Sequence, residues 1–316
     1  MSRILVTGGA GFIGSHVARA LVEAGEEVTI LDDFNDFLYP SELKQARMAL
    51  LFKSEKRPTL ITGSILDQDL LEKLFTNGKF DKVVHLAAHP NPGFSVDKAD
   101  EYTLVNVLGT VNILEACSAH DVVQLIFAGS SSVYNDEQTP FVETAYPLNP
   151  RSPYGASKAA AELYCQMWSD LKGLPVTVLR FFSVYGPWGR PDMAPFIFSQ
   201  QVMDDETIFL SKDRKRDFTY IEDIVSGVLL ALERKFDFEI INLGRGNPID
   251  LRTFIDAIEK ATGKKAHMVD REAPPGEMKV TYANTEKAKK LLGYEPKVSV
   301  EEGVHKMVEW MKTYAT

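Results

Sequence analysis

The sequence TGGAGFIG, Thr7–Gly14, stands between an apolar run, RILV, and a helical pattern over Gly14–Ala24. Its glycines Gly8, Gly11 and Gly14 have the spacing GxxGxxG. Glycine permits a tight turn from strand to helix, lets the backbone approach a pyrophosphate, and allows close helix–strand packing. The helix N-terminus adds open amides that favour an anion. The segment therefore predicts a dinucleotide site, although a glycine-rich structural turn can have the same spacing.

An acidic residue after the next predicted strand supports the dinucleotide site. Asp32 follows the run EVTIL, at close to the interval of ~20 residues at which a carboxylate meets the adenosine ribose hydroxyls. This carboxylate would repel a 2′-phosphate, and the next residues, Asp33 and Phe34, supply no cation. The sequence thus predicts NAD rather than NADP. A nucleotide hydrolase is excluded because the loop lacks the Gly-Lys-Ser/Thr that holds β- and γ-phosphates.

Short apolar runs alternate with helical patterns through the first 180 or so residues, as in RILVTG, EVTIL, TLITG, KVVHLAA, QLIFAG and PVTVLRF. This alternation predicts the α/β class, with a doubly wound parallel sheet. Prolines and glycines then crowd VYGPWGRPDMAP, and two later helices are expected over Leu251–Thr262 and Val300–Thr313. A smaller second lobe is therefore expected. The predicted division is 1–182 with 217–244 for the sheet domain, and 183–216 with 245–316 for the second lobe.

Composition excludes several other classes of protein. The 316 residues carry a net charge of −9 and no extended basic surface, so nucleic acid is not expected as a partner. No apolar run approaches the ~20 residues of a membrane span, and the N-terminal run is too short for a signal peptide. Cys117 and Cys165 lack a metal-ligand spacing and are expected to be two reduced, buried thiols. These features predict a cytoplasmic protein.

A second motif, SPYGASK at Ser152–Lys158, suggests acid–base chemistry. A helix places positions i and i+4 on one face, so Tyr154 and Lys158 should point the same way. A neighbouring ammonium favours the phenolate and lowers a pKa that starts near ~10, which would make the tyrosine a usable base. Ser130–Ser132 follow the strand QLIFAG, at the edge where open α/β sheets bind ligands. An exposed polar helix face can carry the same pair, but the three signals together favour a catalytic site.

Three histidines are further candidates for a functional role. His16 lies in the first helical pattern and His85 in the run KVVHLAA, and neither has a companion at ligand spacing. Both are therefore predicted to be structural. His89 follows the strand that contains His85 and is left open.

Six motifs resemble, in order and spacing, the extended short-chain dehydrogenase/reductases that act on nucleotide sugars: TGGAGFIG, HLAA, SSSVY, YGASK, RFFSVYGP and RDFTYIEDI. The resemblance covers essentially the whole chain. It implies a Rossmann-type fold with an α/β C-terminal substrate lobe, NAD as cofactor, a UDP-sugar as substrate and no metal. It also implies a homodimer formed through the helices expected over Tyr102–Ala119 and Tyr154–Leu171.

The resemblance further implies a role for individual residues. Tyr154, Lys158 and Ser130 would be catalytic. Tyr154 and Lys158 would also contact NAD, together with Gly8, Gly11, Phe12, Ile13, Gly14, Asp32, Asp33, Ser64, Ile65, Leu86, Ala87, Ala88 and Asn106. The substrate would be bound by Ser130, Ser131, Ser132, Ser183, Arg190, Arg216 and Glu277, with Arg216 on the diphosphate.

Residues just before the motif VY separate reactions within this family. Dehydratases carry an Asp-Glu pair there, and enzymes that decarboxylate uronic acids carry a Glu, whereas this chain has Ser131 and Ser132. Hydroxyls cannot supply the second acid and base that elimination needs, so 4-epimerisation is predicted. The segments LDDFND, GPWGRPDMA and RDFTYIEDIV most resemble UDP-glucuronate 4-epimerases. The alternatives are a UDP-glucose/UDP-galactose or N-acetyl 4-epimerase and a non-catalytic NAD-binding regulatory protein.

Overall fold

A computed structural model describes residues 1–51, 53, 56–135, 138–273 and 277–314. Its centre is a sheet of seven strands in the order β11-β6-β5-β4-β1-β2-β3, and every pair in it is parallel. The strands are β1 (Arg3–Thr7), β2 (Glu27–Asp32), β3 (Thr59–Thr62), β4 (Lys82–His85), β5 (Gln124–Ser130), β6 (Val176–Phe181) and β11 (Phe238–Leu243). The prediction of an α/β fold with a parallel sheet is confirmed.

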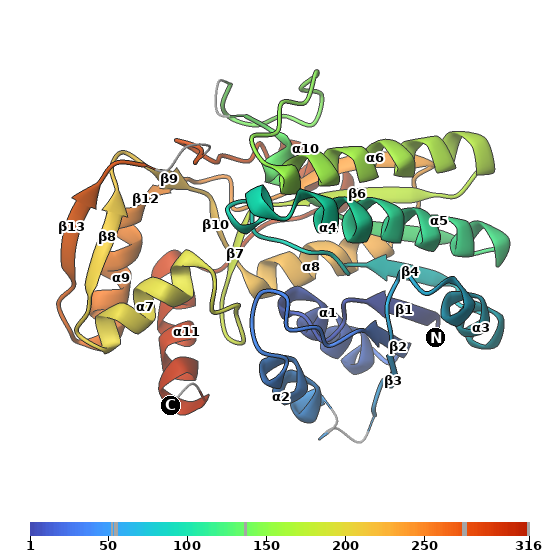
Figure 1. Ribbon diagram of the computed structural model, residues 1–316, viewed down its shortest axis with the longest axis horizontal. Helices are drawn as coiled ribbons and strands as arrows, with labels where there is room; N and C mark the ends of the chain where they lie inside the picture. Colours follow the sequence, from blue (N-terminus) through green and yellow to red (C-terminus); the bar gives the residue numbers. More distant parts are fainter. Residues whose placement is uncertain (52, 54–55, 136–137, 274–276, 315–316) are drawn as a thin grey trace.

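Helices cover both faces of the sheet (Figure 1). One face carries α1 (Phe12–Glu23), α2 (Glu42–Leu51) and α8 (Ile221–Leu232). The other carries α3 (Gln68–Gly78), α5 (Gly109–Ala119) and α6 (Pro153–Lys172). Strand residues alternate between the two resulting cores, since Ile4 and Val6 pack with the first group and Leu5 with the second. Burial on both faces explains why these strands read as continuous apolar runs.

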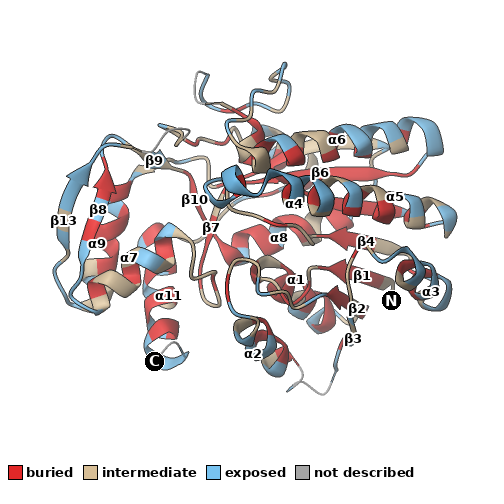
Figure 2. Cartoon of the chain, in the orientation of Figure 1, coloured by how far each residue is buried: buried red, intermediate tan, exposed pale blue. Residues whose placement is uncertain are grey.

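Two neighbouring strands of the sheet, β5 and β6, are buried along their whole length (Figure 2). All residues of β5 and β6 are buried, and β5 continues without a break into Ser130. Cys117 of α5 and Cys165 of α6 are free and fully buried in the core between these helices and the sheet, as predicted. The side chain at the end of β5 is therefore presented from a rigid support.

The helix expected over Tyr102–Ala119 is interrupted. The chain forms α4 (Ala99–Thr103), then the π-helical turn η2 (Leu104–Leu108), and only then α5. Inside the π turn, the side chain of Asn106 makes two hydrogen bonds with the backbone of His89. Its Oδ1 accepts from the His89 N–H at 2.7 Å, and its Nδ2 donates to the His89 carbonyl at 2.9 Å. Such turns often mark functional sites in helices, and here the turn carries a side chain that fixes the loop after β4.

The second lobe lies beside the carboxyl ends of the sheet (Figure 1). It contains α7 (Ala194–Met203), β8 (Thr207–Ser211), β9 (Lys215–Arg216), β12 (Ile249–Asp250), α9 (Leu251–Thr262), β13 (His267–Arg271) and α11 (Val300–Tyr314). Helix α10 (Glu286–Leu292), which lies between β13 and α11 in the sequence, packs against β11 and α8 of the sheet domain. Strands β8 and β13 pair in parallel, and α9 packs against α7 and α11. The parallel pair β7 (Ser183–Tyr185) and β10 (Phe218–Tyr220) lies where the lobe joins the sheet. Among the described residues, no helix has the length and apolar character needed to cross a membrane.

Candidate active site

A cavity of about 660 Å³ opens at the carboxyl edge of the sheet, between the sheet and the second lobe. Its volume is in the range of small-molecule and cofactor sites. One part, here called the glycine-loop end, is lined by the turn after β1 and by Asp32 and Ser64. The other part, called the arginine end, is lined by Ser183, Arg190 and residues of the second lobe. The two ends meet at Ser130, Tyr154 and Lys158.

Close packing requires glycine in the turn between β1 and α1. Gly8 has a φ of 68°, and a Cβ there would lie 2.6 Å from the Ala87 nitrogen. A Cβ at Gly14 would lie 2.1 Å from the Gly8 oxygen. Gly11 is the N-cap of α1 and has no side chain to cover the first amides of the helix. The turn therefore leaves open backbone amides beside the cavity, which fits the pyrophosphate of a dinucleotide.

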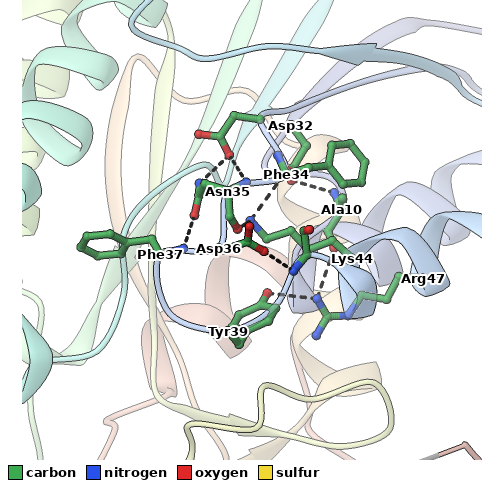
Figure 3. Close-up of polar contacts among 11 residues, drawn as sticks. Ala10, Asp32, Phe34, Asn35, Asp36, Phe37, Tyr39, Lys44 and Arg47 are labelled. Atoms are coloured by element: carbon green, nitrogen blue, oxygen red, sulfur yellow. Dashed lines mark hydrogen bonds and ion pairs between the residues drawn. The ribbon is translucent and has the colours of Figure 1, made fainter.

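Asp32 ends β2 as a buried carboxylate that accepts hydrogen bonds from the amides of Ala10 and Phe34, both at 3.0 Å (Figure 3). Burial raises the pKa of Asp32, and the positive charge of Lys44 opposes this rise. The Lys44 ammonium lies 3.9 Å from the carboxylate and donates to the Asn35 carbonyl at 2.8 Å. Asp33 and Phe34 supply no cation, but Lys44, more distant in the sequence, places one beside Asp32. The sequence signal was missed because Lys44 lies on α2 and only the fold brings it to the end of β2.

The structure brings nearly all of the predicted cofactor residues to the cavity wall. Lining residues among them are Gly8, Gly11, Phe12, Ile13, Gly14, Asp32, Asp33, Ser64, Ile65, Leu86, Ala87, Ala88, Tyr154 and Lys158. Asn106 is the exception, because it is buried behind the wall. Its amide also donates to the Ser157 hydroxyl at 2.9 Å, in addition to its bonds with His89. Asn106 therefore orders the loop after β4, and the structure gives it no place on the cavity surface.

Lys158 is buried beneath the centre of the cavity. Its amine donates to the Ala128 carbonyl at 2.9 Å and lies 4.9 Å from the centre of the Phe127 ring. Burial lowers the pKa of Lys158 to about 8, and the carboxylate of Glu162 opposes that fall. Glu162 is itself bound by the buried guanidinium of Arg180, with the shortest contact at 2.7 Å. The carboxylate of Glu162 therefore favours the charged form of Lys158 against the effect of burial.

Tyr154 is half-buried and lines the cavity together with Ser130. Burial raises the pKa of Tyr154, while the Ser130 hydroxyl and the charge of Arg190 lower it. The prediction that Lys158 brings the phenol below its ordinary pKa is wrong in direction. The physical reason is that burial outweighs every opposing contact, and the Lys158 amine is directed to the Ala128 carbonyl.

The arginine end is held by ion pairs. Arg190 makes a bidentate contact with Asp192 at 2.9 and 2.6 Å, and Asp192 also accepts from the Asn91 amide at 2.8 Å. In the second lobe, Arg216 donates to Glu277 at 2.9 Å. All of the predicted substrate residues line the cavity, namely Ser130, Ser131, Ser132, Ser183, Arg190, Arg216 and Glu277. Their side chains come from both lobes.

Several lining residues were not found from the sequence. They include Phe37, Tyr39, Lys44, Asn91, Arg151, Asp192 and Arg271. His89, whose role the sequence leaves open, also lines the cavity. The rings of Phe37 and His89 stack with centres 3.8 Å apart, so two loops meet across the cavity. His85 and His16 are structural, as predicted. The ring of His85 contacts the hydroxyls of Thr7 and Thr110, and His16 contacts the Phe12 carbonyl.

A glycine turn, a carboxylate at the second strand and a Ser-Tyr-Lys cluster around one cavity define a Rossmann-type dinucleotide enzyme that moves a proton at a hydroxyl or carbonyl. Residues 4–244 match the model of the NAD dependent epimerase/dehydratase family. The chain belongs to this family, and its cofactor is NAD. Among the described residues, no group of three His, Cys or carboxylate side chains is placed to bind a metal ion.

Relatives of known sequence support the same family. The chain is 39% identical to UDP-glucuronate 4-epimerase 1 of Arabidopsis thaliana, over 98% of this chain and 77% of that protein. It is 39% identical to a UDP-glucuronate 4-epimerase of Thermodesulfobacterium geofontis, over 99% of this chain and 97% of that protein.

Solved structures agree with this result. The UDP-glucuronic acid 4-epimerase of Bacillus cereus, in complex with UDP-glucuronic acid and NAD, has a TM-score of 0.91 at 36% identity, with 98% of both chains covered. The UDP-glucose 4-epimerase of Thermotoga maritima, with UDP-glucose, has a TM-score of 0.88 at 30% identity, with 99% of both chains covered.

Proposed function

We propose that this protein is an NAD-dependent UDP-glucuronate 4-epimerase that interconverts UDP-glucuronate and UDP-galacturonate. The observation that carries the proposal is one cavity that joins the glycine turn with Ser130, Tyr154 and buried Lys158. It is supported by the full-length similarity to UDP-glucuronate 4-epimerases.

The side chains divide the work of one oxidation and one reduction at C4. Tyr154 takes the proton of the C4 hydroxyl as that carbon becomes a ketone, and returns it when the ketone is reduced on its other face. Ser130 hydrogen-bonds the reacting oxygen and orients the phenol. Lys158 holds a positive charge below the site and binds the cofactor. NAD, when bound, supplies the hydride acceptor and donor, and adds positive charge that favours a nearby phenolate.

Small hydroxyl residues suit a uronate. Ser131, Ser132 and Ser183 line the cavity beside Ser130 and supply donors for the substrate carboxylate without a fixed counter-charge. Ser131 and Ser132 stand where a dehydratase carries its acid and base, and their hydroxyls cannot replace them. Arg216 and Glu277 are assigned to the nucleotide diphosphate side, and Arg190 to the sugar side.

A UDP-glucose 4-epimerase is the second candidate. Two observations favour it. Asp192 already neutralises the guanidinium of Arg190, and the fold is similar to that of the Thermotoga maritima UDP-glucose 4-epimerase. A neutral hexose would need no cation there. The two candidates share all catalytic residues and differ only in the sugar.

We also propose two lobes, 1–182 with 217–244 for NAD and 183–216 with 245–316 for the substrate, and a homodimer. The dimer is supported by exposed apolar side chains on α6 and η2, of which Leu163 is 62% exposed and Leu171 73%. Leu104, Leu108 and Met167 extend this surface. Two such helices from each subunit would bury it in a four-helix interface. A cytoplasmic location stays a prediction from composition.

The proposal is tested by incubating the enzyme in deuterated water with UDP-glucuronate, UDP-glucose or UDP-N-acetylglucosamine, and following the products by NMR. We expect the 4-epimer of UDP-glucuronate with no deuterium at C4, because the hydride returns within the site. Deuterium at C4 would contradict the mechanism, and turnover of only the neutral sugars would select the second candidate. Tyr154→Phe should lose ~10²–10⁴ in rate while still binding NAD.

A further inference from the structure

Arg47 is a buried arginine that neither the catalytic cluster nor the cavity wall includes. It lies on α2 with 2% of its surface exposed, and all five of its N–H groups are hydrogen-bonded. Its acceptors are three carbonyl oxygens and one phenol, so its charge is not paired with a carboxylate. A buried, unpaired guanidinium is costly, and burial accordingly lowers the pKa of Arg47. The contacts of Arg47 must therefore explain why a charged side chain is buried at this place.

One set of contacts reaches the glycine-loop end (Figure 3). Arg47 Nη1 donates to the Ala10 carbonyl at 3.3 Å and to the Tyr39 hydroxyl at 3.0 Å. Ala10 lies between Gly8 and Gly11, and its amide is the one bound by Asp32. Tyr39 lines the cavity at the end of the loop that follows Asp32. Arg47 therefore holds the glycine turn from behind.

The other contacts reach the arginine end. Arg47 Nε and Nη2 donate to the Trp188 carbonyl at 3.1 and 2.7 Å, and Nη2 also reaches the Gly189 carbonyl at 3.3 Å. These are the two residues before Arg190. Trp188 has a φ of 62°, a left-handed conformation that a bulky residue rarely adopts and that its surroundings must maintain. Its ring packs on Trp310 of α11, so the turn is fixed on one side by the second lobe and on the other by Arg47.

We propose that Arg47 is a positioning residue that couples the NAD site to the UDP-sugar site, because it ties the glycine turn directly to the turn that carries Arg190. The proposal rests on the proposed function only in taking the two ends of the cavity as the NAD and UDP-sugar sites. The occupant of one end fixes the turn that Arg47 holds there and so favours the binding geometry at the other end. The link is one side chain with a planar fork of donors, and lysine, with three donors on one atom, cannot span the same acceptors.

The test is the NAD dissociation constant, measured by calorimetry with and without saturating UDP-glucuronate, in a Tyr154→Phe background that suppresses turnover. We expect the nucleotide sugar to tighten NAD binding by about tenfold when Arg47 is present, and by less than about twofold in Arg47→Met. Arg47→Lys should behave like Arg47→Met. Met48→Leu, a conservative change at the next residue of α2, should keep the full coupling.

A purely structural role would lower the melting temperature and leave the coupling unchanged, and that result would overturn the proposal. Absence of coupling with Arg47 in place would overturn it as well. If Arg47→Met fails to fold, Arg47→Gln, which keeps two donors, is measured instead. Failure of the proposed function would appear separately, as NAD coupling to UDP-glucuronate in an enzyme that, with Tyr154 restored, does not epimerise it.

Discussion

At the glycine-loop end of the cavity a glycine turn contributes backbone to the wall, whereas the arginine end carries long charged side chains held by ion pairs. The glycine turn comes from one short stretch of sequence, Gly8 to Gly14. The second end joins Arg190 and Asp192 with Arg216 and Glu277 from another part of the chain. A backbone site tolerates no added atom, and a side-chain site can rearrange. The two ends should therefore respond differently to mutation.

Gly14→Ala should cause the largest loss. Its Cβ would lie 2.1 Å from the Gly8 oxygen and 2.8 Å from the Gly9 Cα, and both are backbone atoms that cannot move aside. We expect no retained NAD and no epimerase activity, with a loss of about 1–3 kcal/mol in the free energy of unfolding. NAD released on denaturation and the unfolding transition measure this. Gly173→Ala is the matched control, because Gly173 has a φ of 67° but no atom within 4 Å of an added Cβ, so its NAD content should be normal.

Arg216→Met should act on the other end alone. Loss of a charged donor to the diphosphate should raise KM for UDP-glucuronate by ~10–100-fold while NAD stays bound, since hydrogen bonds to charged groups contribute about 1.5–3 kcal/mol. Lys215→Met, at the exposed neighbouring residue, is the control. Steady-state kinetics on both variants decide the matter. An unchanged KM would remove Arg216 from the nucleotide site.

Arg190→Met should shift the pH dependence of the rate. Arg190 is one of the groups that lower the pKa of Tyr154 against the effect of burial, so its removal raises that pKa further. The phenolate then forms only at higher pH, and the acidic limb of kcat moves upward. A rate loss of about tenfold at neutral pH corresponds to one unit of pKa. In Arg190→Lys, which keeps the positive charge, the acidic limb of kcat should return most of the way to its original pH. If the limb does not move in Arg190→Met, Arg190 does not act on the pKa of Tyr154.

Lys44→Met should have the smallest effect and shows where a side chain contributes to the glycine-loop end. Lys44 opposes the raised pKa of Asp32, so its removal raises that pKa further. As pH falls, Asp32 takes up a proton earlier and stops accepting both of its amides. We expect NAD binding to weaken by about threefold at neutral pH, consistent with the small energies of ion pairs that are not tightly bonded, and to weaken more at pH 5. The same pH dependence in both proteins would contradict this role.

The glycine turn, Asp32, Ser130, Tyr154 and Lys158 were predictable because local chemistry determines each of them. A strand–helix turn that must admit a pyrophosphate needs glycine, and a helix places Tyr154 and Lys158 on one face. The alternation of apolar runs likewise predicted the parallel sheet. Each of these features follows from a short stretch of sequence whose local structure can be recognised: a turn, one helix face or the end of a strand.

The rest depended on contacts between distant segments. Lys44 and Arg47 lie on an amphipathic helix whose pattern gives no hint that two of its cations are buried. The family resemblance assigned Asn106 to the cofactor. Only the structure shows that Asn106 lies in a π turn and that its side-chain amide binds the backbone of the loop after β4. The pKa of Tyr154 depended on burial, which residue spacing does not reveal.

Asp192 presents to Arg190 the same planar pair of oxygens that a ligand carboxylate would offer. An anionic group that binds the same two donors, Nε and Nη2, would therefore have to displace a carboxylate that already accepts from them, with little net gain of contacts. Weak or badly shaped anions would lose that competition. If Arg190 lies on the sugar side as proposed, Asp192 would take the place of a departing sugar on this guanidinium, so that the sugar could leave its cation at small cost.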